Sequence, residues 1–439
     1  MERALIRELE KWKVSSRRKP LIIRGARQVG KTWLMQEFGS RFFENTVYIN
    51  FDRDRRFHDL LEETLDPGKL LAAFGAVTGK KIHADSTLII LDEIQEEPRA
   101  LSALKYFCEE KPEYAIVAAG SLLGVAMHEG TSFPVGKVDF VDLYPLHFRE
   151  FLLAIGKESL YELLEAKDLS LITGLKGEYV EALRLYYYIG GMPEAVKTYI
   201  STNDFFAVRK VQEQLLLYYR QDFSKHAPAT QIPRLNQVWD SIPSQLAKEN
   251  RKFIYGQIHK GARAKDFELA LQWLEDSGLL HMVHRVTKPG IPLKSYAEMS
   301  AFKVFLHDIG LLGALGGLPV EAVIGGHRMF EEFKGALTEQ YVLQQLKADL
   351  HIHPYYYSAE NSRGELDFLI QGSDNLCPIE VKAEENLQAK SLRAFVEKYK
   401  VPLGVRLSMS GFRRQDWLVN IPLYAFTALW DLALQGQIQ

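Results

Sequence analysis

Residues 25–32 have the types and spacing of a loop that binds phosphate groups. They read G-A-R-Q-V-G-K-T and fit the pattern G-x-x-x-x-G-K-[ST]. Glycine lets the backbone N–H groups turn inward around a polyphosphate, and a helix that starts at the loop adds positive potential. In that chemistry Lys31 reaches the β- and γ-phosphates, and the Thr32 hydroxyl holds Mg²⁺. The residues expected to bind the nucleotide are Gly25, Arg27, Gln28, Val29, Gly30, Lys31 and Thr32.

An apolar run that ends in two acids supplies partner groups for such a loop. Residues 88–91 read L-I-I-L and are followed directly by Asp92 and Glu93. An apolar strand of this kind is typical of a parallel sheet covered on both faces, and ligands bind at the carboxyl ends of such strands. We expect Asp92 to bind Mg²⁺, directly or through water, and Glu93 to orient and deprotonate an attacking water. The alternative is a buried strand followed by an exposed acidic loop.

A third candidate follows another strand-like run. Ser121 comes just after residues 115–119, where a hydroxyl at a strand end could sense the terminal phosphate. A small turn residue explains a serine there equally well. The catalytic candidates are therefore Lys31, Glu93 and Ser121, and the candidate metal ligands of this site are Thr32 and Asp92.

Acidic residues and a lysine near the C-terminus predict a second site. Glu380 and Lys382 alternate with apolar residues, so in a strand both project from one face. Asp367 on a neighbouring strand could form with Glu380 a two-carboxylate site for Mg²⁺ or Mn²⁺, with Lys382 orienting a water molecule. Glu339, on a preceding helix, could complete the site. This is the D…(D/E)-x-K arrangement of metal-dependent nucleases, and a structural Glu380–Lys382 ion pair is the alternative.

The composition is that of a globular protein with more than one core. The chain has 439 residues, of which 47% are hydrophobic, and this length predicts two or three domains. Its net charge of −2 does not indicate a nucleic-acid-binding or membrane-surface protein as a whole. Two distant cysteines, Cys108 and Cys377, suit a reducing compartment. With no signal-peptide core or membrane-spanning run in the sequence, we expect a cytoplasmic protein without a membrane partner.

Alternating strand and helix patterns would position the first site. Strand-like runs occur at 21–23, 47–51, 88–91, 115–119 and 138–143, with helical patterns between them. Such alternation predicts a parallel sheet in a doubly wound α/β domain. The loop and both acids would then lie at one edge of that sheet.

The rest of the chain divides by its patterns. We expect an ATPase core at 1–155 and a mainly helical lid or linker at 156–247. Residues 248–300 resemble a winged helix, with a helix followed by a hairpin-like run at 279–286; such a module could bind DNA or serve for packing. Helices and strands in 301–439 predict an α/β/α nuclease-like domain.

Together these residues resemble a prokaryotic family of AAA+ ATPases. In that family a P-loop ATP-binding domain is joined to a C-terminal domain of unknown function similar to the PD-(D/E)-x-K restriction-endonuclease-like fold. The resemblance implies ATP and Mg²⁺ as cofactors, nucleotide and Mg²⁺ roles for Lys31, Thr32, Asp92 and Glu93, and the sensor position for Ser121. Besides the two sites, it rests on L-Y-P-L-H-F-R-E-F at 143–151, G-G-M-P-E at 190–194, Q-D-F-S-K at 221–225 and G-A-L-T-E at 335–339.

One position departs from that family. Many relatives have Gly-Arg before the fifth strand, whereas this chain has Gly136 and Lys137. If the arginine acts across a subunit interface, Lys137 replaces a bidentate donor with a point charge. Arg149 and Arg220 are alternative candidates for such an arginine. Homo-oligomerisation is therefore left open.

The sequence thus predicts a Mg²⁺-dependent ATPase that couples nucleotide state to a DNA-binding or nuclease-like C-terminal domain, with double-stranded DNA as the candidate partner. Endonuclease activity with a second Mg²⁺ or Mn²⁺ is left open. One alternative is an ATP-gated regulatory or interaction switch whose nuclease-like fold is catalytically inactive. Another is a protein-remodelling ATPase without a nucleic-acid partner.

Overall fold

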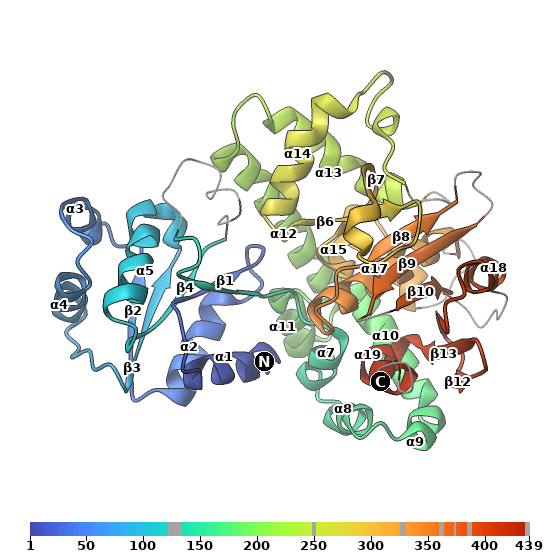
Figure 1. The fold of residues 1–439 in the computed structure, drawn as a ribbon, viewed down its shortest axis with the longest axis horizontal. Coiled ribbons are helices and arrows are strands. Elements are labelled where there is room, and N and C mark those ends of the chain that lie inside the picture. The colour runs from blue at the N-terminus through green and yellow to red at the C-terminus, as the bar shows by residue number, and fades with distance from the viewer. Residues whose placement is uncertain are drawn as a thin grey trace. The chain divides into compact units, whose positions relative to one another are not determined.

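The chain folds into two compact units, which are described separately. The computed structural model describes residues 1–121, 124, 134–247, 252–324, 331–359, 364–372, 375–383 and 389–434. The N-terminal unit comprises Glu2–Tyr144 with Trp273–Leu279, and the C-terminal unit comprises Pro145–Gln272 and Leu280–Gln439, to which Met1 is assigned (Figure 1). Among the described residues, no helix combines the length and the apolar character needed to cross a membrane.

A five-stranded sheet forms the centre of the N-terminal unit. Its strand order is β2-β3-β4-β1-β5, and all neighbouring strands run parallel. The strands are β1 Leu21–Arg24, β2 Asn45–Asn50, β3 Thr87–Asp92, β4 Ala115–Ala119 and β5 Asp139–Asp142. All five coincide with runs expected from the sequence, and the predicted parallel sheet of an α/β fold is confirmed.

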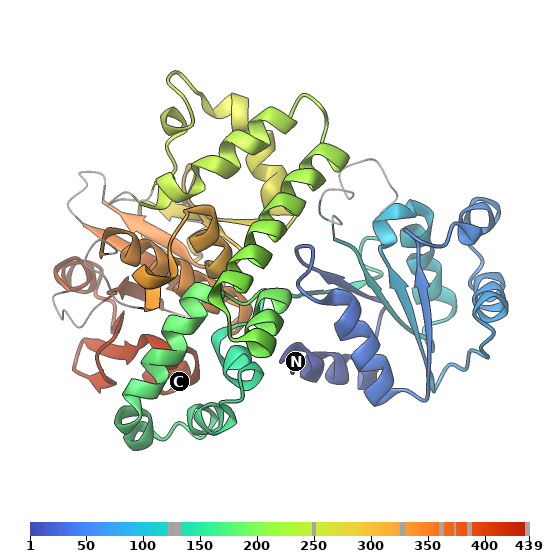
Figure 2. The same cartoon turned by 180° about the vertical axis from the view of Figure 1, so that it is seen from behind.

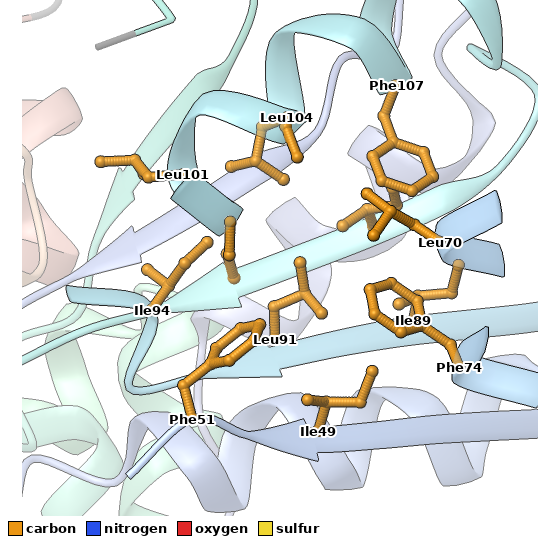
Figure 3. Close-up of a cluster of buried hydrophobic side chains, with 14 of the residues drawn as sticks. Ile49, Phe51, Leu70, Phe74, Ile89, Leu91, Ile94, Leu101, Leu104 and Phe107 are labelled. Carbon is orange, nitrogen blue, oxygen red and sulfur yellow. The ribbon is translucent and has the colours of Figure 1, made fainter. Parts of the chain in front are cut away.

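A hydrophobic cluster covers one face of this sheet. Three helices contribute to it: α3 Arg56–Glu63, α4 Pro67–Thr78 and α5 Pro98–Glu110. Figure 3 shows Ile89 and Leu91 of β3 among Phe74 of α4 and Leu104 and Phe107 of α5, all of them buried. Side chains of a strand project alternately to its two faces, so Ile89 and Leu91 of β3 pack under these helices.

The opposite face packs against α2, Lys31–Phe42, which begins at the end of the candidate phosphate loop. A Cβ on Gly39 of α2 would lie 2.5 Å from Thr46 Oγ1 and 3.4 Å from Leu88 Cδ2, so the helix approaches the sheet closely only with glycine there. Helix α1, Leu5–Val14, adds Trp12, whose ring centroid lies 6.3 Å from that of Phe38. With helices on both faces, the fully buried β3 is explained.

A mixed eight-stranded sheet forms the centre of the C-terminal unit. Its order is β12-β13-β11-β10-β9-β8-β6-β7. The sequence has strand-like runs at 355–358, 366–370, 378–383 and 403–407, and strands β8 to β11 coincide with them. The short β12 and the buried β13 were not anticipated. The strands are β6 Leu280–Val286, β7 Ala297–Leu306, β8 Tyr355–Ser358, β9 Glu365–Gln371, β10 Leu376–Val381, β11 Gly404–Ser408, β12 Arg413–Arg414 and β13 Leu418–Pro422.

The segment that resembles a winged helix contributes two strands to this sheet. Helix α14, Ala264–Asp276, is present as expected. The hairpin-like run at 279–286, however, forms the single strand β6, which pairs antiparallel with β7 and parallel with β8. The expected boundary at residue 300 lies inside β7. Because both edges of β6 are paired, it is part of a continuous sheet, and the winged-helix resemblance stays a prediction.

Helices surround this sheet, and the longest is α12, drawn in green in Figure 2. The sequence pattern at 205–223 predicts one long helix, and α12 is that helix. The helices are α7 Phe148–Ala154, α8 Glu158–Glu165, α9 Leu169–Gly174, α10 Lys176–Ile189, α11 Pro193–Thr202, α12 Phe205–His226, α13 Ile232–Leu246, α15 Ile309–Leu315, α16 Val320–Ile324, α17 Glu331–Ala348, α18 Lys390–Tyr399 and α19 Phe426–Leu434. Short 3₁₀ turns are η2 Tyr255–Gln257, η3 Leu293–Tyr296 and η5 Leu423–Ala425.

The G-G-M-P segment at 190–193 surrounds a buried aspartate. The Gly191 N–H donates to Asp308 Oδ2 over 2.6 Å, and the Leu311 N–H donates to Asp308 Oδ1 over 3.0 Å. A Cβ on Gly190, whose φ is +75°, would lie 2.2 Å from Asp308 Oδ1. Burial raises the pKa of Asp308 to about 6, although these N–H donors act in the opposite direction. The motif therefore has a structural explanation in the packing of this unit.

Buried glutamines on α17 join the other segments of the C-terminal unit. Three of these glutamines accept hydrogen bonds from backbone N–H groups that would otherwise be buried without a partner. In addition, Gln344 donates to the hydroxyl of Tyr186 over 3.0 Å, so α17 contacts α10 through a polar group. The acceptor pairs are Gln340 Oε1 with the Leu306 N–H at 2.9 Å, Gln344 Oε1 with the Ile309 N–H at 3.0 Å, and Gln345 Oε1 with the Phe148 N–H at 2.7 Å.

Candidate functional site

The candidate phosphate loop connects the end of β1 to the start of α2. Its backbone has φ values of +144° at Gly25, +66° at Gln28 and +97° at Gly30. A Cβ on Gly25 would lie 2.2 Å from the Leu143 carbonyl oxygen, so this position accepts only glycine. The loop thus has the left-handed backbone and the adjacent helix N-terminus that an anion-binding loop requires.

Lys31 lies at the first position of α2 and is buried, with 7% of its surface exposed. Its Nζ donates to the carbonyl oxygens of Gly25 and Ala26, both over 2.8 Å. Burial lowers the pKa of Lys31 to about 8, while Glu93 and Asp92 act to raise it. The ammonium is therefore held over the loop by the two carbonyl groups, at the place where phosphate oxygens would compete for it.

Thr32 and Asp92 meet as the sequence predicts. Thr32 Oγ1 donates to Asp92 Oδ2 over 2.8 Å, and the Tyr48 hydroxyl donates to the same oxygen over 2.8 Å. Asp92 Oδ1 accepts the Glu93 N–H over 3.1 Å. A hydroxyl and a carboxylate in direct contact are the hard oxygen ligands that Mg²⁺ prefers, so these residues fit the ion expected from the loop.

Glu93 follows β3 with a left-handed backbone, at φ +52°. Its Oε2 accepts Gln95 Nε2 over 2.7 Å and Ser121 Oγ over 3.2 Å. A non-glycine residue with positive φ is strained, and such strain is common at functional sites. Since β3 and β4 are parallel neighbours, with Asp92 opposite Ala119, Glu93 and Ser121 come from the same edge of the sheet. The structure therefore brings the Ser121 hydroxyl to the Glu93 carboxylate.

The remaining loop residues take different positions. Val29 is fully buried, and its carbonyl accepts Arg3 Nη1 over 2.9 Å; Arg3 Nη2 also donates to the Tyr144 carbonyl over 2.6 Å. The side chain of Val29 thus packs inside, which leaves its backbone for any contact with a nucleotide. Arg27 lies close enough to Lys31 to lower the pKa of the ammonium, although burial is the larger cause.

The sequence did not identify three residues that support this site: Arg3, Tyr48 and Gln95. Tyr48 is half-buried in β2, and burial raises its pKa to about 12, with Asp92 contributing in the same direction and Asn50 opposing it. A tyrosine in a strand is usually a packing residue, and its contact with Asp92 depends on β2 and β3 being neighbours. No local pattern encodes that pairing.

The candidate arginines and Lys137 all form ion pairs. Lys137 Nζ lies 2.9 Å from Glu109 Oε1 on the surface of the N-terminal unit. In the C-terminal unit, Arg149 Nε donates to Asp349 Oδ2 over 2.8 Å, and Arg149 also pairs with Glu165. Arg220 pairs with Asp240. Arg149 is mostly buried in its network, so it serves as a structural cation of the C-terminal unit.

The second constellation is partly assembled. Antiparallel β9 and β10 place Asp367 beside Glu380, and Asp367 Oδ2 accepts the Val381 N–H over 2.7 Å. Lys382 Nζ lies 2.7 Å from Glu380 Oε1, whereas Glu380 Oε2 is buried and has no hydrogen-bond partner among the residues that the structure describes. Burial raises the pKa of Glu380, and Lys382 opposes this. An unsatisfied buried carboxylate oxygen leaves room for a ligand.

Glu339 does not join that pair as the sequence suggested. It is buried on α17, and its Oε2 lies 3.7 Å from Lys303 Nζ, which also contacts Glu365 Oε1 over 2.8 Å. Among the described residues, which include all four candidates, no three His, Cys, Asp or Glu side chains converge as metal ligands. Lys303 and Glu365 were not anticipated, because their contact joins β7 to β9 across the sheet.

Arg406 adds a further cation beside Glu380. The two residues are opposite each other on the parallel strands β10 and β11. Arg406 is buried, and its Nε donates to Asn420 Oδ1 over 2.9 Å. Burial lowers the pKa of Arg406, while Glu380 raises it. The carboxylate of Glu380 therefore lies between two cations from different strands.

Three family models match separate parts of the chain. The AAA domain matches residues 17–152, a domain of unknown function (DUF8612) matches residues 180–322, and another (DUF4143) matches residues 334–426. None of the curated proteins compared matches this chain.

Solved structures of ATPases show remote similarity. A Walker-type ATPase of Pyrococcus abyssi is 15% identical, with a TM-score of 0.44, over 71% of this chain and 94% of that one. The Orc1 protein of Aeropyrum pernix, solved in complex with DNA, is 14% identical, with a TM-score of 0.27, over 73% and 93% of the two chains. Cdc6p of Pyrobaculum aerophilum is 12% identical, with a TM-score of 0.25, over 70% and 88%. Similarity at this level supports no conclusion.

The sequence match and the geometry of the N-terminal unit coincide. The matched segment 17–152 contains the loop, β3 with its two acids and Ser121. On these grounds residues 17–152 are an AAA-type P-loop domain.

Proposed function

We propose that the N-terminal unit binds ATP with Mg²⁺ and hydrolyses it. The observation that carries the proposal is the 2.8 Å hydrogen bond from Thr32 Oγ1 to Asp92 Oδ2. Thr32 follows Lys31 at the start of α2, and Asp92 lies at the end of β3, so the bond joins the helix after the phosphate loop to the acid at the strand end. A hydroxyl and a carboxylate from these two positions hold Mg²⁺ in P-loop ATPases.

Each residue has a distinct task in this proposal. Backbone N–H groups at the start of α2 bind the phosphates, and Lys31 leaves its two carbonyl partners to contact them. Glu93 accepts a proton from the attacking water, and Ser121 and Gln95 hold its carboxylate in position. Bound by Thr32 and Asp92, Mg²⁺ would neutralise charge on the phosphates.

Two substitutions and a matched control test this site. Lys31→Ala should abolish ATP binding, because the loop loses its cation. Glu93→Gln should retain ATP and block turnover, because an amide cannot take the proton of water. Glu96→Gln changes a nearby acid of the same loop and should leave both properties as in the wild type. Unchanged ATP hydrolysis in Lys31→Ala and Glu93→Gln, measured as phosphate release, would refute the assignment.

We also propose that nucleotide state is coupled to the C-terminal unit through the chain. Within the N-terminal unit, Gly278 has φ +73°, and a Cβ there would lie 3.1 Å from the Ala26 nitrogen of the phosphate loop. Leu279 follows and directly precedes β6 of the C-terminal sheet. A loop that rearranges around phosphates would therefore press on a segment covalently joined to that sheet. Gly278→Ala should alter ATP affinity measurably if this contact matters.

A second candidate function is metal-dependent cleavage of DNA by a restriction-endonuclease-like C-terminal unit. The observation that favours it is Glu380 Oε2, buried and without a hydrogen-bond partner beside Asp367 and Lys382. Purified protein with Mg²⁺ or Mn²⁺ should nick plasmid DNA, and Asp367→Ala or Lys382→Ala should stop it. Glu397→Gln, an exposed change on α18, is the control. Equal nicking by all four proteins would indicate a contaminating nuclease.

The alternative is an ATP-gated switch with an inactive nuclease-like fold, and the incomplete ligand set among the described residues favours it. Either form could bind double-stranded DNA. Binding that weakens steeply with salt, and weakens further on changing Arg263 and Lys265, would support DNA as the partner. ATP hydrolysis by a protein that shows no salt-sensitive DNA binding would favour the switch or a protein-remodelling role.

A further inference from the structure

A buried lysine, Lys303, contacts two carboxylates near the sheet face that carries Asp367 and Glu380, which we call the nuclease-like face. Lys303 lies in the middle of β7, and only 1% of its side chain is exposed. Its Nζ lies 2.8 Å from Glu365 Oε1 and 3.7 Å from Glu339 Oε2. The same Nζ is 5.0 Å from the centroid of the Tyr356 ring. These partners come from β9, α17 and β8, so the ammonium joins four elements.

The surroundings of this ammonium are those that a cation needs. A buried charge is costly unless it is paired, and here two carboxylates and an aromatic face supply negative potential. Two carboxylates from different elements are also a ligand set that binds divalent ions such as Mg²⁺. Lysine is a compact point charge, so it can take the place of such an ion without fixed ligand geometry.

This cluster adjoins the candidate metal pair. Glu365 and Asp367 are two residues apart on β9, and strand alternation places them on one face. Asp367 in turn neighbours Glu380, whose Oε2 has no hydrogen-bond partner among the described residues. Of these four acids, Glu339 on α17 and Glu365 on β9 contact Lys303, whereas Asp367 lies beside Glu380, which pairs with Lys382. Nucleases with paired ions hold them about 3.5–4 Å apart between shared carboxylates.

We propose that Lys303 is the resident cation of Glu339 and Glu365 and excludes a divalent ion from them. Among the described residues, the nuclease-like face then offers only Asp367 and Glu380 as metal ligands, and these two hold no more than one divalent ion. Lys303 therefore sets the number of divalent ions that this site can bind. The Lys303 half of the proposal does not rest on the proposed nuclease function, whereas the Asp367–Glu380 half does.

Counting bound Mn²⁺ tests the proposal in the full-length, nucleotide-free chain. Free Mn²⁺ is measured by electron paramagnetic resonance during titration, with Asp92→Ala as background to remove a metal ligand of the nucleotide site. Lys303→Gln removes the charge and should bind one more Mn²⁺ per chain than the Asp92→Ala parent. Adding Glu339→Gln to Lys303→Gln should abolish the extra ion. An unchanged count in a folded Lys303→Gln protein would overturn the proposal.

A second measurement keeps the test decisive if Lys303→Gln does not fold. Glu339→Gln in the presence of Lys303 should leave the Mn²⁺ count unchanged, because Glu339 is not a metal ligand. A count that falls with Glu339→Gln would overturn the proposal. Glu380→Gln reports separately on the proposed nuclease site: its failure to reduce Mn²⁺ binding would reject that site and leave the role of Lys303 standing.

Discussion

Raising the pH should weaken ATP binding through Lys31. Burial lowers the pKa of this ammonium to about 8 in the nucleotide-free protein, and phosphate contact should raise it because the charged form gains a partner. The bound state then holds more protons than the free state above pH 8. The affinity for ATP is therefore highest below about pH 8. It should fall about tenfold for each pH unit above that value, which corresponds to about 1.4 kcal/mol of binding free energy.

The assay is a titration with a fluorescent ATP analogue and Mg²⁺ between about pH 7 and 9.5, together with calorimetry in two buffers of different ionisation enthalpy. At pH 8 binding should take up about half a proton. Lys31→Arg is the matched control, because a guanidinium stays protonated over this range and should give a flat profile. Wild-type affinity that does not change up to pH 9.5, with no proton uptake, would refute the reasoning.

Two further predictions concern the C-terminal unit. Asp308→Ala leaves the Gly191 and Leu311 N–H groups buried without an acceptor, and should lower the free energy of unfolding by about 2 kcal/mol or more in urea titrations while ATP binding is retained. Arg149→Leu removes the guanidinium that pairs with the buried Asp349 carboxylate and leaves it with His147, at an expected cost of about 3 kcal/mol. Burial acts to raise the pKa of Asp349, but His147 and Arg149 lower it to about 2. A carboxylate whose pKa is lowered by folding stabilises the fold at pH values above the pKa that it has in the unfolded chain. The loss in free energy of unfolding caused by Arg149→Leu should therefore shrink as the pH falls from about 4 towards 2. Loss of ATPase activity in a fully stable Arg149→Leu protein would point instead to a catalytic arginine.

The nucleotide site could be predicted from sequence because its parts are local patterns at strand ends. Gly25, Lys31 and Thr32 belong to one short motif, and Asp92 and Glu93 directly follow an apolar strand. Parallel strands place their carboxyl ends at one edge of the sheet, so the two patterns had to meet there. The hydrogen bond from Thr32 to Asp92 is the result.

The C-terminal face shows where such prediction stops. Strand alternation correctly put Glu380 and Lys382 on one face, and their ion pair follows from that. Glu339 was assigned to the same site because it precedes the strands on a helix. In the structure Lys303 holds it instead, and nothing local to either residue indicates that contact.

The winged-helix interpretation stays a prediction, because the local pattern does not specify the partners of its strand. A helix followed by an apolar, alternating run is compatible with a wing, and α14 and β6 have that local order. The partner of an exposed-looking strand edge is not encoded in its own residues, however. Here β6 pairs with β7 on one side and β8 on the other, which extends the C-terminal sheet.

By itself the sequence determined the candidate phosphate loop, the acids beside it, the strands of the N-terminal sheet and strands β8 to β11 of the C-terminal sheet, since each depends on the spacing of neighbouring residues. Only the tertiary structure decided which strands are neighbours, and therefore that Tyr48 contacts Asp92 and that Lys303 lies between Glu339 and Glu365. The physical reason is that side-chain period specifies which face a residue occupies, whereas strand order and helix docking specify what lies opposite it.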